Sequence, residues 1–179
     1  MKNKTDYRWV IKIIAMSICI SAVFNFLSSE ILDGAGFFLA VIVLLIFIVI
    51  GIIFDMVGMA VASAVEVPFH AMSSHRVKGA AESIKLVRNA EKVSSVCNDV
   101  VGDIAGIISG STGAAIVANL VRDMSLNSML ISVVVSGLVA GLTIGGKALG
   151  KTVAVNKSTE IVLTCGKIIS IFKSLFKRK

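Results

Sequence analysis

Sulfur, imidazole and proline are scarce in this chain. Its 179 residues include three cysteines, two histidines and one proline. Cys19, Cys97 and Cys165 lie far apart in the sequence, and no Cys-x-x-Cys or Cys-His grouping occurs, so we expect neither a zinc site nor a redox site. His70 and His75 have no paired nucleophile, and no phosphate-binding loop or metal-hydrolase motif is present. An enzyme is therefore the least expected class of function.

Aromatic and acidic residues are also few. Aromatic side chains make up 6% of the chain, and the basic residues outnumber the acidic ones to leave a net charge of +7. Proteins that bind nucleic acid often combine basic residues with stacking aromatic side chains. Because that combination is missing, we expect no nucleic-acid partner. The positive charge fits attraction to a membrane surface that carries anionic lipid.

Apolar residues, in contrast, are abundant. They make up 56% of the chain, which is more than one soluble domain of this length can cover. They are concentrated in four blocks, each long enough to cross a bilayer, which takes about 20 residues in a helix. The sequence therefore predicts an all-α, polytopic integral membrane protein with about four transmembrane helices. The four blocks are Trp9 to Leu27, Phe37 to Val65, Ile104 to Val121, and Leu126 to Leu149.

The basic residues predict the orientation of these helices. With the N-terminus inside the cell, the segments 1–8, 66–99 and 150–179 are cytoplasmic. Every Lys and Arg except Arg122 then lies on the cytoplasmic side or can snorkel to it. The positive-inside rule thus predicts a multi-pass protein of the cell membrane with both termini in the cytoplasm. Its expected partner is a lipid bilayer with an anionic cytoplasmic leaflet.

Two polar segments complete the domain organisation. Segment 73–99 has apolar residues at helical spacing among charged ones, which predicts a cytoplasmic helix or short hairpin broken near Asn89. The C-terminal stretch has the pattern of a basic amphipathic helix, which suits either a membrane surface or a partner subunit. We divide the chain into a basic segment with one helix (1–35), a central membrane domain (36–156) and a C-terminal amphipathic helix (157–179).

Glycines recur at every fourth position in two of the predicted spans. Small residues at this spacing let helix backbones approach closely in lipid, where van der Waals contact drives association. The two stripes predict a compact bundle and are compatible with a homodimer. They are Gly102, Gly106 and Gly110 in the third span, and Gly137, Gly141 and Gly145 in the fourth.

Acidic residues stand in or beside the predicted spans, where ionisable groups are costly and usually functional. Asp99 and Asp103 are four residues apart, so they project from one face of a helix. Two carboxylates on one face repel each other unless a proton or a cation joins them. The alternative is that these acids only cap helices at the level of the lipid headgroups.

The stretch from Ser63 to Pro68 gathers oxygen atoms at the end of the second block. Pro68 has no amide hydrogen to donate to the carbonyl of Ala64, so a helix break is expected there. That carbonyl, the Ser63 hydroxyl and the Glu66 carboxylate are then available together. Magnesium prefers such a set, with one or two carboxylates, neutral oxygens and retained water.

Several motifs in this chain resemble those of one family of magnesium transport proteins. Ser63-Ala64-Val65-Glu66 is similar to the Ser-x-x-Glu motif in the first helix of the CNNM/CorB transmembrane domain. Residues 80–92 resemble that family's cytoplasmic helix, 104–110 its second helix, and 146–160 its Gly-Glu-Ile-x-Pro-Lys segment with the stretch that follows. The likeness covers roughly residues 40 to 175, and the motifs occur in the same order.

The resemblance implies a dimeric three-helix domain that binds Mg²⁺ within the membrane. On this basis Ser63 and Glu66 are the expected ligands from one helix, and Asn98, Asp99 or Asp103 supply those from the next. The expected function is transport of a divalent cation, Mg²⁺ above all.

The chain also departs from the family pattern. After Gly146, Lys147 stands where the family has a glutamate, and Gly150 replaces its proline. The span Trp9 to Leu27 is additional, and the regulatory CBS domains are not found in this sequence. An ammonium group at position 147 can take the place of the ion by pairing with Glu66 or Asp103, or it can snorkel inward. The alternative function is a structural or regulatory subunit that transports nothing, in which Lys147 neutralises the buried acids.

Overall fold

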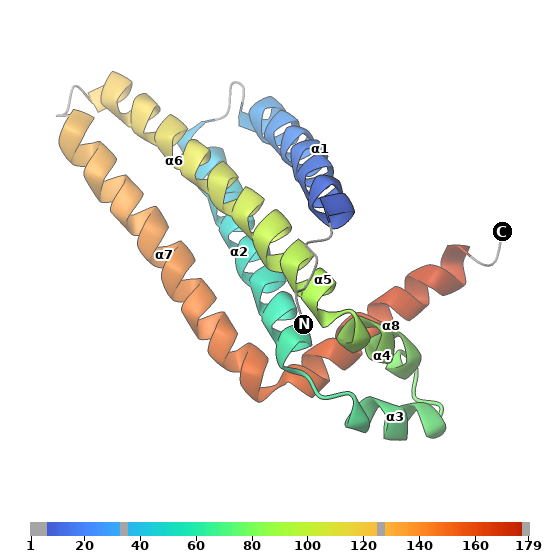
Figure 1. Ribbon diagram of the computed structural model, residues 1–179. Coiled ribbons are helices and arrows are strands. Elements are labelled where there is room, and N and C mark those ends of the chain that lie inside the picture. The colour runs from blue at the N-terminus through green and yellow to red at the C-terminus, as the bar shows by residue number, and fades with distance from the viewer. Residues whose placement is uncertain (1–6, 33–35, 125–127, 177–179) are drawn as a thin grey trace. The chain divides into compact units, whose positions relative to one another are not determined.

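The computed structural model describes residues 7–32, 36–124 and 128–176, and all regular secondary structure in these ranges is helical. This confirms the all-α prediction for the described part of the chain. The long helices are α1 (Tyr7–Leu32), α2 (Phe37–Ser63), α6 (Asp103–Met124), α7 (Ser128–Asn156) and α8 (Ser158–Phe176) (Figure 1). The short ones are α3 (Val67–Ser74), α4 (Ala80–Arg88) and α5 (Ala90–Ser95), and Val96–Gly102 is π-helical.

Four helical stretches are long and apolar enough to cross a membrane. Each overlaps one of the apolar blocks, so the prediction of four long apolar helices is confirmed for the described residues. The second stretch ends two residues before its block does, and residues 126 and 127 of the fourth block lie outside the described residues. The third stretch begins earlier than its block, at Ala90, because the π-helical residues join α5 to α6 without a turn. The stretches are Tyr7–Ile31, Phe37–Ser63, Ala90–Val121 and Met129–Asn156.

The helices pack in two compact units, each with a hydrophobic core of its own. The first unit comprises the chain up to Gly51 together with Asp99–Gly145, and the second comprises Ile52–Asn98 and Gly146–Lys179. The unit boundaries therefore fall inside α2, the π-helical segment and α7.

The core of the first unit is formed by apolar side chains one helical turn apart. Helix α2 contributes Val43 and Phe47, and the apolar side of α1 packs against them, with the rings of Phe24 and Phe47 edge to face at 6.0 Å. The additional N-terminal helix is thus part of this core. The buried residues that complete the core are Val100, Ile104 and Ile108.

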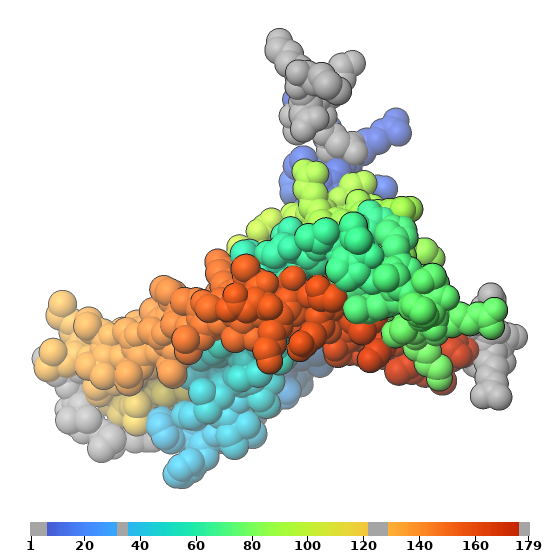
Figure 2. Space-filling model, turned by 90° about the horizontal axis from the view of Figure 1, so that it is seen from below, coloured from blue at the N-terminus to red at the C-terminus, as the bar shows by residue number. Residues whose placement is uncertain are grey.

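The second unit is held together by a close crossing of α4 and α8. Figure 2 shows the green residues of α3 and α4 beside the red ones of α8. Gly79 has a positive φ of 87°, and a Cβ atom added to Gly166 would overlap the Gly79 carbonyl oxygen and the Ser83 hydroxyl. The Ser83 hydroxyl lies 3.0 Å from the Gly79 carbonyl oxygen and 3.1 Å from that of Val162. The crossing therefore requires a glycine on each side, Gly79 at the start of α4 and Gly166 in α8, with the Ser83 hydroxyl between the two helices.

Most glycines of the two predicted stripes make no close contact with another described helix. At five of these glycines, no described atom outside the glycine's own stretch of helix lies within 4 Å of the place where a Cβ would stand. Glycines outside the stripes do make close contacts, as at Gly51, beside Ala105 and Gly102, and at Gly146, where a Cβ would overlap the Ile52 side chain. Spacing defines a face of a helix but not the direction in which that face points. The five open glycines are Gly106, Gly110, Gly137, Gly141 and Gly145.

Candidate functional site

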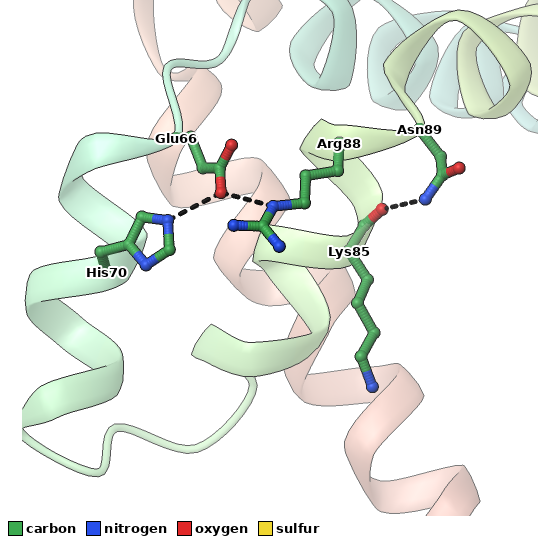
Figure 3. A network of polar contacts seen from close by, with 5 residues as sticks. All are labelled: Glu66, His70, Lys85, Arg88 and Asn89. Atoms are coloured by element: carbon green, nitrogen blue, oxygen red, sulfur yellow. Dashed lines mark hydrogen bonds and ion pairs between the residues drawn. The ribbon is translucent and has the colours of Figure 1, made fainter.

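Glu66 lies in the short link between α2 and α3, and the side chains of His70 and Arg88 contact its carboxylate. Helix α2 ends at Ser63, and α3 begins with Pro68 in its first turn, where the missing amide hydrogen costs nothing. This confirms the helix break predicted at Pro68. The Glu66 Oε1 atom accepts hydrogen bonds from His70 Nε2 and Arg88 Nε, both at 2.7 Å (Figure 3).

These two contacts hold Glu66 in its ionised form. The hydrogen bond from His70, followed by the one from Arg88, lowers the pKa of Glu66 below its usual value of 4.5. The carboxylate thereby ties the start of α3 to the end of α4. His70 follows Glu66 by one helical turn, so that contact can be read from the sequence, whereas Arg88 is brought there by tertiary packing. Ser63 is exposed at the end of α2.

Asp55, an acid that the motif analysis did not single out as a ligand, is buried on α2 between two lysines of α7. Lys147 Nζ lies 3.9 Å from Asp55 Oδ1, and Lys151 Nζ lies 3.9 Å from Asp55 Oδ2. At this distance an ammonium group attracts the carboxylate without a direct hydrogen bond. Asp55 Oδ2 has no hydrogen-bond partner in the described part of the chain. Since a buried charge is costly unless it is compensated, the two lysines make the burial of Asp55 possible.

Asn98 packs closely against Gly58 of α2 in the second unit. A Cβ atom on Gly58 would overlap the Asn98 side-chain amide, so glycine at position 58 makes room for it. The Asn98 Nδ2 donates to Ser94 Oγ at 3.3 Å, and its buried Oδ1 has no hydrogen-bond partner among the described residues. Asn98 also stands in the π-helical segment, a kind of irregularity that is frequent at functional sites.

Asp99 and Asp103 line a groove in the first unit. The groove has a volume of about 540 Å³ and lies against α1, whose contribution includes three polar side chains four residues apart, Ser17, Ser21 and Asn25. Asn25 Nδ2 donates to the Ser21 carbonyl oxygen at 2.9 Å and lies 3.2 Å from its hydroxyl. This polar stripe was not predicted from the sequence, although its spacing within an apolar helix is a readable signal.

The side chains around this groove carry the oxygen donors that hard cations prefer. They provide two carboxylates, two hydroxyls and one amide oxygen, a set suited to Mg²⁺ with several waters retained. The five predicted ligands are thus divided between the units. Asp99 and Asp103 line the groove of the first unit, while Ser63, Glu66 and Asn98 belong to the second. No group of three or more His, Cys, Asp or Glu side chains suited to a metal ion occurs in the described residues.

Comparison with known proteins adds no family to this picture. No family model, no curated protein and no solved structure matches the chain. The resemblance to the CNNM/CorB family rests on the motifs alone, and the residues of the candidate site rest on their geometry.

Proposed function

We propose that this protein crosses the cell membrane four times, with both termini in the cytoplasm, and transports a divalent cation, Mg²⁺ by preference. The observation that carries the proposal is the oxygen-lined groove of Asp99, Asp103, Ser17, Ser21 and Asn25. The three polar residues of α1 stand in the middle of an apolar helix long enough to span a bilayer. The groove that they line is then at membrane depth, where polar side chains usually serve ions or protons.

The chemistry of the groove supports a divalent rather than a monovalent cargo. Two carboxylates one helical turn apart repel each other, and a doubly charged cation between them relieves that repulsion most effectively. The hydroxyls and the amide of α1 replace part of the hydration shell, and the open side of the groove leaves room for the waters that Mg²⁺ retains. In this role Mg²⁺ is cargo, bound and released on opposite sides of the membrane.

The decisive experiment measures Mg²⁺ flux into liposomes that contain the purified protein and an internal Mg²⁺-sensitive dye. We expect flux from the wild type, and we expect Mg²⁺ to raise its melting temperature because the ion binds only the folded state. Asp99→Asn and Asp103→Asn should lose both effects. Glu66→Gln is the matched control, since it removes an acid that is already paired with Arg88 outside the groove. A wild type with neither flux nor Mg²⁺-dependent stabilisation refutes the proposal.

A second candidate function is a structural or regulatory subunit that carries no ion. The observation in its favour is the position of Lys147, whose side chain is only 21% exposed and lies beside the buried Asp55. A tethered ammonium compensates that acid permanently and leaves it no need of a metal ion. This candidate predicts a stable, membrane-inserted protein without Mg²⁺ flux, so the same liposome measurement separates the two functions.

We further propose that the protein works as a homodimer. The open glycine faces of α6 and α7 support this, because helices with exposed small residues associate closely in lipid. Between these helices in the first unit lies a groove of about 260 Å³ whose lining includes Gly106, Gly110 and Gly113. A second copy that packs its own small residues there would cover this surface.

A further inference from the structure

Helix α8 has more apolar surface than the neighbouring helices bury. Its buried side, at Val162 and Gly166, meets α4 through the glycine crossing described above. A second set of apolar side chains on the same helix is left open, with exposed fractions of 50% to 65%. These residues follow the spacing i, i+3, i+4 and i+7 and so form one face. They are Ile168, Ile171, Phe172 and Leu175, which we call the outer face of α8.

One lysine borders the outer face. Lys167 is exposed one position before Ile168, whereas Lys173 lies on the side of α8 that meets α4, with its Nζ 3.4 Å from Glu82 Oε1. The sequence after α8 continues with Lys177, Arg178 and Lys179. An apolar face with basic residues beside and after it is the composition of helices that lie in the headgroup region of a bilayer with anionic lipid.

The short connection between α7 and α8 bears on the position of α8 relative to a membrane surface. Helix α7 ends at Asn156 and α8 begins at Ser158, so Lys157 alone separates them. The backbone hydrogen bonds from Lys157 N to Val153 O at 2.9 Å and from Ile161 N to Lys157 O at 3.1 Å carry the chain directly from one helix into the other. If α7 crosses the membrane as proposed, α8 therefore starts at the membrane surface.

We propose that the outer face of α8 is a docking surface for anionic phospholipid. The apolar side chains enter the boundary between headgroups and acyl chains, and Lys167 contacts the lipid phosphates. Figure 1 shows the C-terminal end of α8 extending past α4, and the four side chains of the outer face are exposed. The proposal depends on membrane insertion of α7 but not on cation transport.

Site-directed spin labelling of the full chain in lipid nanodiscs tests this proposal. Cys19, Cys97 and Cys165 are first replaced by serine or alanine, and a single label is then attached through Phe172→Cys. Ser174→Cys is the matched control, because it lies two residues later and points to the opposite side of the helix. The accessibility of each label to oxygen and to a water-soluble nickel chelate is measured in phosphatidylcholine discs with and without phosphatidylglycerol.

We expect the label at position 172 to be severalfold more accessible to oxygen than to the chelate, with the reverse at position 174. The difference should grow when phosphatidylglycerol is added. The proposal is overturned if both labels are equally accessible to the chelate. It is also overturned if the difference in accessibility between the two labels does not change when phosphatidylglycerol is added. Shielding from both reagents with spin–spin broadening overturns it in favour of a second copy of the chain. Ile171→Cys provides a second reporter if Phe172→Cys does not fold, and none of these readouts depends on Mg²⁺ flux.

Discussion

Asp55 and Glu66 are acids of similar chemistry that the protein stabilises in two different ways. Glu66 is partly exposed and accepts two short hydrogen bonds from His70 and Arg88. Asp55 is buried and has two ammonium groups at 3.9 Å, beyond hydrogen-bonding distance. The first arrangement fixes the direction of a side chain, whereas the second supplies mainly charge compensation. Mutation of the two acids should therefore have different effects on the stability of the protein.

The contacts of Glu66 make the stability of the protein sensitive to acid. Since its folded pKa is lowered below the usual 4.5, its contribution is fully present above that pH and is lost as the pH falls through the folded value. Glu66→Gln removes this contribution. The difference in melting temperature between wild type and Glu66→Gln should therefore be largest near neutral pH and shrink below about pH 4.5. A difference that stays constant with pH contradicts this account.

We expect strong energetic coupling between Asp55 and the lysines beside it, Lys147 and Lys151. Lys147→Met should lower the free energy of unfolding by up to about 3 kcal/mol, limited because Lys151 still compensates the acid. Asp55→Asn in the same chain should restore part of the loss, since no buried charge then remains uncompensated. Denaturation of Lys147→Met, Asp55→Asn and the double variant in detergent measures the coupling. Lys85→Met, which removes an exposed lysine of α4, serves as the control.

At the scale of helices, glycine decides which elements come closest. Gly166→Ala should destabilise the second unit by about 1 to 3 kcal/mol, because the new methyl group overlaps a backbone carbonyl that cannot turn away. Gly106→Ala is the control, because the space where its methyl group would stand is open and alanine has the higher helix propensity. Thermal melts followed by circular dichroism compare the two. Equal losses in both variants would show that the α4–α8 crossing is looser than described.

At the scale of the whole molecule, the open glycines of α7 bear on assembly. A bulky side chain there prevents two helices from approaching closely in lipid. Gly141→Leu should therefore convert the proposed dimer into a monomer without lowering the helix content, because no described atom outside its own stretch of helix lies within 4 Å of a Cβ at that position. Light scattering of the detergent-solubilised protein measures the mass. A wild type that is already monomeric contradicts the dimer, and so does a variant that stays dimeric.

The sequence by itself determined the local features of this protein. Four long apolar helices, the break at Pro68 and the break at Asn89 all follow from hydrophobic length or from one residue and its neighbours. The pairing of Asp99 with Asp103 on one groove follows from their spacing. Such features depend on interactions within a turn or two of helix, which a linear pattern contains.

Only the tertiary structure decided which helix faces meet. It brought Arg88 to Glu66, placed Lys147 and Lys151 beside Asp55, and set the polar stripe of α1 against Asp99 and Asp103. Periodicity defines the faces of a helix, but the rotation of that helix about its axis depends on the packing of residues far away in the chain. For this reason the acids and a partner one helical turn away, such as His70, were visible in the sequence, and the partners from distant helices were not.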